Sequence, residues 1–288
     1  MAEKIPIRKI KQTQLEPALA GSFSIRFLQD VLDGKDMNES LHRHEFFLIL
    51  VLKQAKGTHE IDFVSYDVTN QSIFLLRPGQ VHRLSLKAGS TGYIVQFKND
   101  FFSSKNASAT ELLRKVSHKK ICNVEGSGFG AITATLDNIY KEYTEKREGY
   151  EDIIKSNLNI FFIELVRQRQ NTESQSEAIN PYSQEKLEKL FELLDLNIVD
   201  SKQVSYYADK LNLSTYQLGA ITKTLLSKTP SELINEHIVL EAKRQLLATS
   251  NQVNQIAYQL GYEDVSYFIR FFKKHTGHSP DSFRTISK

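Results

Sequence analysis

The sequence predicts an α+β protein, in which an N-terminal β-barrel and following helices precede an all-α domain of two helix-turn-helix subdomains joined by a linker helix. Residues 22–97 predict the barrel, because they hold short segments rich in aromatic and β-branched residues between turn residues. Beyond Ser108 the apolar residues recur at helical spacing instead. An internal repeat within residues 182–288 predicts the two subdomains.

The expected strands of the barrel are FSIRFL, FFLILVL, HEIDFVSY, SIFLLRP and GYIVQF. Residues that favour turns separate them: Gly34, Gly57, Asn70, Pro78, Gly79 and Gly89. Short strands at regular spacing are typical of a β-sandwich or a small barrel. We assign residues 1–105 to this domain.

Helical segments follow the barrel. Residues 106–170 are predicted as a helical region that either covers the barrel or pairs with a second subunit. Its apolar positions are more numerous than one barrel face needs, which favours a homodimer. Residues 171–181 have no apolar period and end in Pro181, so they are predicted as a linker. Residues 182–288 then form the second helical domain.

Composition excludes several classes of protein. The 288 residues are enough for two domains, with 40% hydrophobic and 25% charged residues, and no apolar run is long enough to span a membrane. Cys122 is the only cysteine, which excludes an internal disulfide and a CxxC metal site. The N-terminal stretch MAEKIPIRKIKQ lacks the apolar core of a signal peptide. A cytoplasmic protein with no membrane partner is expected.

The net charge of +3 indicates little by itself, but positive charge gathers near the C-terminus. After Val265 the only acidic residue is Asp281. The cationic residues in the same stretch are Arg270, Lys273, Lys274, Arg284 and Lys288. Local concentration of cations is the form that a phosphate-contacting surface takes.

The repeat relates residues 208–218 to residues 257–268. Ala208 matches Ala257 at an offset of 49, and Leu218 matches Phe268 at an offset of 50 after one residue is gained in the turn. Each copy reads as a short helix, a turn and a second helix, at about residues 201–227 and 250–277. Further matches are Leu211 with Leu260, Leu213 with Tyr262, Lys223 with Lys273, and Thr229-Pro230 with Ser279-Pro280.

The residues of the second copy explain its local structure. Gly261 suits a left-handed turn, and Asp264 or Glu263 can cap the following helix. Between the copies, residues 231–249 form an amphipathic segment without internal Pro or Gly, about 28 Å long as a helix. A rod of that length can hold two recognition helices roughly one turn of DNA apart, about 34 Å.

The stretch EAKRQLLATSNQVNQIAYQLGYEDVSYFIRFFKKHTGHSPDSFR resembles the signature of the AraC/XylS family of bacterial transcription regulators. In that family the second helix of each copy enters a segment of the major groove. The resemblance implies that Val265, Ser266 and Arg270 face bases, with Lys273 and Lys274 near phosphates. In the first copy it assigns the same roles to Tyr216, Gln217 and Lys223.

The first copy departs from the family pattern. Gly219 and Ala220 stand where polar residues or Arg are common, Thr222 replaces a core aromatic, and Ser227 replaces the Gly. Side chains without donors cannot read base edges by hydrogen bonding. The first copy is therefore expected to position the protein on DNA more than to read sequence.

Two short motifs, LHRHEFF and RPGQVHRL, resemble the metal motifs of cupin barrels, with which many AraC-type regulators begin. His42 and His44 alternate so that both point to one face of a strand, and His82 could join them. The Glu that the cupin pattern requires is absent, since Leu48 and Ile49 occupy its place. Three interpretations stay open: a metal site, half-buried polar residues at the barrel mouth, or a pocket for a small organic effector, which is anionic if Arg43 or Arg83 helps to bind it. We expect no metal and no cofactor.

The function expected is that of a sequence-specific transcription regulator, without enzymatic activity, that binds double-stranded DNA and a small-molecule effector. A homodimer is expected, and contact with RNA polymerase if the protein activates transcription. A metal-dependent cupin enzyme fused to a DNA-binding module, and an effector-independent DNA binder, are the alternatives.

Overall fold

The computed structural model describes residues 6–10, 19, 21–103, 107–124, 126–173 and 180–286. Two compact units divide the chain, one of residues 6–175 and one of residues 176–288. The first is rich in strands and the second is helical, which confirms the α+β prediction. Most of the predicted linker, residues 174–179, lies outside the described residues, as does Lys288.

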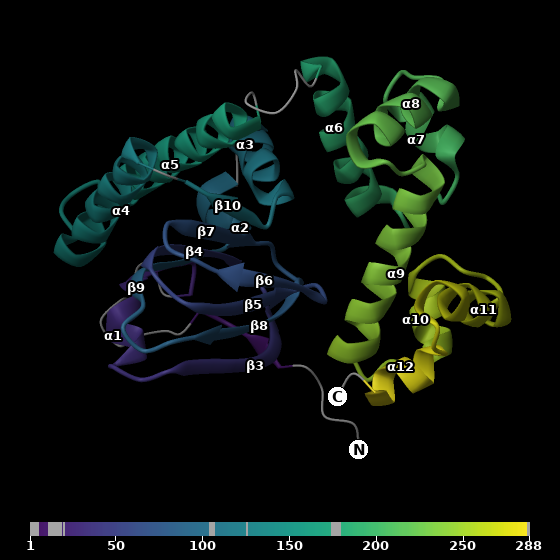
Figure 1. Cartoon of the computed structure of the whole chain (residues 1–288), viewed down its shortest axis with the longest axis horizontal. Coiled ribbons are helices and arrows are strands. Elements are labelled where there is room, and N and C mark those ends of the chain that lie inside the picture. The colour runs from purple at the N-terminus through teal and green to yellow at the C-terminus, as the bar shows by residue number, and fades with distance from the viewer. Residues whose placement is uncertain are drawn as a thin grey trace. The chain divides into compact units, whose positions relative to one another are not determined.

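Two five-stranded sheets form the body of the first unit (Figure 1). One sheet has the order β1 (Ile7–Arg8), β3 (Met37–His44), β8 (Val81–Leu86), β5 (Gly57–Ile61) and β6 (Val64–Val68). The other has the order β10 (Ile121–Asn123), β7 (Ser72–Leu76), β4 (Phe47–Gln54), β9 (Thr91–Phe97) and β2 (Phe23–Phe27). Pairing is antiparallel except between β1 and β3.

The side chains of the second sheet alternate between two cores. Along β4, Leu48 and Leu50 face the other sheet and pack in the interior of the sandwich, whereas Ile49 and Val51 face outward. The pattern repeats on β9, where Ile94 points inward and Val95 outward. Both faces of this sheet are therefore buried, which explains the continuous apolar run FLILVL of β4.

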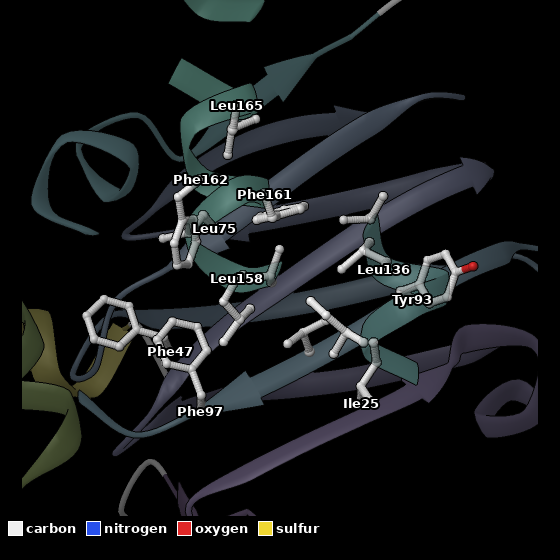
Figure 2. Packing of buried hydrophobic residues seen from close by; sticks show 14 of the residues in the cluster. Ile25, Phe47, Leu75, Tyr93, Phe97, Leu136, Leu158, Phe161, Phe162 and Leu165 are labelled. Carbon is white, nitrogen blue, oxygen red and sulfur yellow. The ribbon is translucent and has the colours of Figure 1, made fainter. Parts of the chain in front are cut away.

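Helices cover the outward face of that sheet. Helices α3 (Ala107–His118), α4 (Ser127–Glu145) and α5 (Tyr150–Glu173) belong to the same buried cluster as the sheet residues. Figure 2 shows Leu136, Leu158, Phe161, Phe162 and Leu165 of the helices against Ile25, Phe47, Leu75, Tyr93 and Phe97 of the strands. The apolar residues of these helices are thus buried against the sheet of the same chain. Short helices α1 (Leu28–Leu32) and α2 (Asn99–Ser103) complete this unit.

One predicted strand is divided in the structure. The segment HEIDFVSY was expected to be a single strand, but β5 ends at Ile61 and β6 begins at Val64. Asp62 and Phe63 between them have φ of 52° and 67°, so they form a two-residue hairpin turn. The prediction was wrong because neither residue is the Gly or Asn that usually marks such a turn.

The second unit is a bundle of short helices around one core. Its elements are α6 (Pro181–Asn197), α7 (Val204–Lys210), α8 (Thr215–Leu226), α9 (Pro230–Ala248), α10 (Val253–Gln259), α11 (Val265–Thr276) and α12 (Pro280–Ile286). Helix α9 has 19 residues and contacts both α7 with α8 and α10 with α11. It is the linker helix that the sequence predicted for residues 231–249.

The two helix pairs have matching turns. Asn212 and Gly261 occupy equivalent positions and have φ of 55° and 71°. A side chain at Gly261 would be severely crowded, since its Cβ would lie 2.1 Å from the carbonyl oxygen of Val199. At Asn212 the same conformation is adopted by a residue type that tolerates the left-handed region. The turn expected at Gly261 is therefore confirmed.

Candidate nucleic-acid interface and ligand pocket

Helix α11 presents a polar face opposite its buried one. Asp264 caps the helix, because its Oδ1 accepts hydrogen bonds from the backbone N–H groups of Ser266 at 2.7 Å and Tyr267 at 3.2 Å. Phe268 and Phe272 are fully buried in the core of the unit. These contacts fix how the helix is oriented, so the side of α11 opposite Phe268 and Phe272 points to solvent.

Four residues that the sequence singled out share the exposed side of α11: Ser266, Arg270, Lys273 and Lys274. Their spacing of three and four residues places them on one helical face. The guanidinium of Arg270 lies 3.9 Å from the Asp264 carboxylate, and its side chain is 69% exposed, so this pair restrains it little. Neither lysine makes an ion pair with a described residue. The face is cationic and accessible.

Two further residues of α11 differ from expectation. Val265 is only partly exposed, because it packs against the core of the unit. Tyr267, which was not among the predicted DNA-contacting residues, is 55% exposed at the first turn of the helix. Its place three residues after the capping Asp264 could have indicated it. Tyr267 thus offers the more accessible side chain beside Ser266.

Helix α8 of the first copy is capped differently. Ser214 Oγ accepts from the backbone N–H of Gln217 at 3.2 Å, and Gln217 Oε1 accepts from the backbone N–H of Ser214 at 2.8 Å. A glutamine that reads a base in the major groove binds adenine through both its amide oxygen and its amide nitrogen. The capping box already uses the oxygen. Gln217 therefore has a structural role that competes with base readout.

The exposed face of α8 has large side chains at its two ends and only small residues between them. Tyr216 is 84% exposed at the N-terminal end, and Lys223 is exposed two turns later. Between them stand Gly219 and Ala220. A Cβ added at Gly219 would meet no atom within 4 Å, so packing inside the protein does not require a glycine there.

The other departures of the first copy have structural equivalents. Thr222 is fully buried at the position of Phe272, and its hydroxyl donates to the carbonyl of Gly219 at 3.3 Å.

Arg284, which the sequence placed among the cations near the C-terminus, makes its hydrogen bonds inside the unit. Its Nε and Nη2 donate to the carbonyls of Leu246 at 2.9 Å and Asn251 at 2.6 Å. Arg284 therefore anchors α12 rather than enlarging the cationic face.

A cavity of about 550 Å³ lies between the two sheets of the N-terminal unit. The three predicted histidines, His42, His44 and His82, all line it and are buried. The structure thus brings together the residues of the two motifs. The remaining lining residues are Arg8, Lys9, Arg26, Val31, Met37, Glu39, Phe46, Leu48, Leu50, Leu84, Ile94 and Gln96.

A fourth histidine, His59 of β5, extends the group. His59 Nε2 lies 2.9 Å from Nδ1 of His82, and Nε2 of His82 lies 2.7 Å from Nε2 of His44. His42 Nδ1 donates to the carbonyl of Ser40 at 2.6 Å. No sequence motif marks His59, which only strand pairing brings beside His82.

Burial keeps these imidazoles neutral. Burial, with a smaller contribution from the neighbouring His42, lowers the pKa of His44 and of His59 to about 3. Burial also lowers the pKa of His82 and, less strongly, that of His42. All four imidazoles are therefore uncharged hydrogen-bonding groups at neutral pH.

The histidines fit a resident metal poorly. The ligand nitrogens of His42, His44 and His82 lie within 4.8 Å of one another. However, both ring nitrogens of His82 already face other histidines, and Nδ1 of His44 and of His59 have no hydrogen-bond partner to orient the rings. The cupin Glu is replaced by Leu48, which adds an apolar wall. The absence of a metal stays a prediction.

The cations of the cavity are not those suggested by the sequence. Arg83 lies on the outer face, where its Nε and Nη2 donate to the carboxylate of Glu60 at 3.0 and 3.2 Å. Arg43 does not line the cavity, because it alternates with His42 and His44 along β3. Both suggestions were therefore wrong. The cavity contains Arg8, Lys9 and Arg26 instead.

Two family models match the chain. One, an AraC-like ligand binding domain, matches residues 31–157, and the other, a helix-turn-helix domain, matches residues 207–286. The chain belongs to the AraC family of transcription regulators. The resemblance found in the sequence is thereby confirmed. Within the described ranges, the helices of this AraC-family protein lack the combination of length and apolar character needed to cross a membrane.

Three proteins illustrate what this AraC-family chain is similar to. The transcriptional activator RhaS of Yersinia pestis is 22% identical over 258 residues, which cover 85% of this chain and 88% of RhaS. The bifunctional transcriptional activator and DNA repair enzyme AdaA of Bacillus subtilis is 33% identical over 97 residues, covering 34% and 46%. The crystal structure of fatty-acid-bound ToxT of Vibrio cholerae is 21% identical, with a TM-score of 0.41, covering 91% and 95%.

Proposed function

We propose that this AraC-family regulator places α8 and α11 in successive segments of the DNA major groove and responds to a small molecule bound between its two sheets. The observation that carries the proposal is the pair of exposed helix faces joined through α9. On one face stand Ser266, Arg270, Lys273 and Lys274, and on the other Tyr216 and Lys223. Lysines and arginines on such faces neutralise phosphates, and a recognition helix reads bases through a few side chains.

The two faces have different roles in this proposal. Arg270 carries a forked donor that can bind guanine O6 and N7. Lys273 and Lys274 contact phosphates, as does Lys223 on α8. Tyr216 packs on the DNA surface, while Gln217 is restrained by its capping box. Helix α11 therefore supplies most of the sequence readout, with Ser266 beside Arg270 and Val265 at the edge of the contact.

The cavity is proposed as the effector site because it lies between two sheets and combines polar with apolar walls. Its volume of about 550 Å³ falls in the range of small-molecule sites. His42, His44 and His82 supply neutral hydrogen-bonding groups to its polar wall. We propose no catalytic role and no resident metal for them. Metal analysis of protein purified without a histidine tag tests the second point, since stoichiometric iron or zinc would contradict it.

The N-terminal unit also offers a surface for a second copy of the chain. Ile153 and Ile160 of α5 are 40% and 48% exposed and lie two turns apart on one side of the helix. We propose a cytoplasmic homodimer joined through this face, with RNA polymerase as a further partner if the protein activates transcription. Sedimentation of wild type and Ile160→Asp tests the dimer, because a charge in an apolar interface should shift the protein toward monomer.

The experiment that tests the function is a salt titration of DNA binding by the full chain. Fluorescence anisotropy with labelled duplexes should give an affinity that falls with salt, with a log–log slope of about −0.9 for each phosphate contact. Lys273→Ala and Lys274→Ala should each reduce that slope. A folded protein whose binding to every duplex is absent, or insensitive to salt, would refute the proposed function.

A further inference from the structure

The cavity contains an arginine, Arg26, that pairs with no residue described by the structure. Arg26 belongs to β2, whose residues Phe23 and Ile25 pack outward under the helices, so alternation turns Arg26 toward the cavity. Its side chain is half-buried and makes no hydrogen bond or ion pair with any described residue. A guanidinium is costly to desolvate unless it is paired, so an unpaired one in a cavity favours an anionic occupant.

Gln96 stands beside Arg26 on the same wall. In the register of β2 with β9, Ser24 pairs with Gln96 and Arg26 with Ile94. Gln96 therefore lies one diagonal step from Arg26 on the cavity face of the sheet. Its amide also makes no hydrogen bond with a described residue. The wall thus offers a forked guanidinium and an amide donor side by side.

The other charges of the cavity do not neutralise Arg26. Arg8 forms a salt bridge with Glu39, which is the one carboxylate among the described lining residues. Lys9 is exposed at the rim and adds positive charge. With Arg8 and Glu39 cancelling each other, the lining has an excess of positive charge. An anion would enter a cavity of complementary potential.

Apart from the three histidines, the rest of the described lining is apolar, and part of it lies next to the two donors. Leu48 pairs with Gln96, and Leu50 pairs with Ile94, in the register of β4 with β9. Side chains of these residues therefore continue the wall away from Arg26. The other apolar lining residues are Val31, Met37, Phe46 and Leu84.

We propose that the cavity binds an organic carboxylate with an apolar body, whose carboxylate accepts hydrogen bonds from Arg26 and Gln96 while its apolar part packs on Leu48, Leu50 and Ile94. A carboxylate is the anion whose two oxygens match the planar fork of a guanidinium. The inference rests on the proposed effector function of the cavity and names its ligand class. In this proposal, Arg26 and Gln96 are the residues that favour an anionic ligand over a neutral one.

A matched pair of fluorescent probes tests the charge selection on the full chain. The probes are 8-anilinonaphthalene-1-sulfonate, an apolar anion, and N-phenyl-1-naphthylamine, the same rings without the anionic group. Wild type should bind the anion about tenfold or more tightly than the neutral probe. Arg26→Gln should remove that preference and leave the neutral probe unchanged, whereas Arg26→Lys should retain part of it. Displacement of the anion by 4-phenylbutyrate but not by 4-phenylbutyramide extends the result to carboxylates.

Control variants keep the outcome interpretable. Arg83→Gln removes an arginine from the outer face and should change neither probe's affinity. Leu50→Trp fills the cavity and should abolish binding of both probes. If this variant still binds the probes, they bind outside the cavity and the inference is overturned. Equal affinities of the two probes, no binding of either, or an unchanged preference in Arg26→Gln would overturn it too. Salt-sensitive DNA binding by the same proteins would show that the regulator function stands even then.

Discussion

Ser227 ends α8 in the same left-handed conformation in which Gly277 ends α11, with φ of 55° and 79°. The backbone N–H of each donates to a carbonyl one turn earlier, that of Lys223 or Lys273. A left-handed conformation carries no side-chain penalty in glycine and costs about 1 kcal/mol in other residues. The first copy has therefore kept the geometry of the repeat while it lost the residue best suited to it.

Ser227→Gly should stabilise the protein by about 0.5–1 kcal/mol, because it removes the strain of a side chain in the left-handed region. The converse change, Gly277→Ser, should destabilise the second copy by a similar amount. Urea unfolding of the full chain, followed by far-ultraviolet circular dichroism, measures both. Loss of stability in Ser227→Gly would contradict the explanation by strain.

Gly219→Ala should raise the free energy of unfolding by about 0.5–1 kcal/mol, since alanine favours the helix and its methyl group meets open space. The same change should weaken DNA binding, because a methyl group would occupy surface against which the DNA backbone packs. Unfolding and anisotropy measurements on one preparation separate the two effects. A variant that is both more stable and equally tight on DNA would mean that Gly219 does not face the duplex.

Arg270→Ala and Lys273→Ala should have different effects on DNA binding, the first on sequence preference and the second on overall affinity. Loss of a bidentate base contact costs about 1–3 kcal/mol on the cognate site and relaxes preference at one or two base pairs. Loss of a phosphate contact should instead weaken all duplexes alike and reduce the salt slope. Affinities for cognate and random duplexes at several salt concentrations provide the comparison. Equal losses of Arg270→Ala on both duplexes would remove its assignment as a base reader.

The free energy of unfolding of the N-terminal unit should decrease as the pH is lowered below 6.5. The folded pKa of His59 is about 3, below the ordinary value of 6.5, so between these values the unfolded chain takes up a proton that the folded chain does not. The contribution of His59 to the free energy of unfolding is therefore fully present above pH 6.5. It decreases as the pH falls toward 3, by at most about 1.4 kcal/mol per pH unit for each such histidine.

His59→Gln should reduce the loss of thermal stability between pH 7.5 and pH 5, because it removes one such group and keeps a hydrogen-bonding side chain beside His82. His275→Gln, an exposed position on α11, is the matched control and should behave like wild type. Differential scanning fluorimetry across this pH range gives the midpoints. Parallel curves for wild type and His59→Gln would show that His59 does not set the acid limit.

Much of the DNA-binding unit could be predicted because its evidence is local. Offsets of 49 and 50 between the copies placed the turns, and Asp264 at the start of α11 predicted its cap. The capping box of Gln217 is also visible in the sequence as Ser followed three residues later by Gln, at a position that the family resemblance assigns to DNA contact. The local capping rule therefore applies at Gln217, and its role at the DNA stays a prediction.

The ligand pocket was predictable only in part, because its walls come from strands far apart in the chain. His42 and His44 could be paired by alternation along one strand, and a motif added His82. Arg26 and Gln96 share a wall only through the register of β2 with β9, which a single sequence does not reveal. Arg43 and Arg83 were favoured because they are neighbours of histidines in sequence, and that adjacency puts them on the opposite face.

The most direct test is a binding-site selection from random duplexes with the full chain, scored base by base, alongside Arg270→Ala. We predict two recognition segments about one helical turn apart, one sharply defined under α11 and one vague under α8, because Gly219 and Ala220 offer no side-chain donors. Arg270→Ala should blur the sharp segment alone. Two equally sharp segments would show that unidentified residues of α8 read bases, and no enriched sequence at all would contradict sequence-specific recognition by this protein.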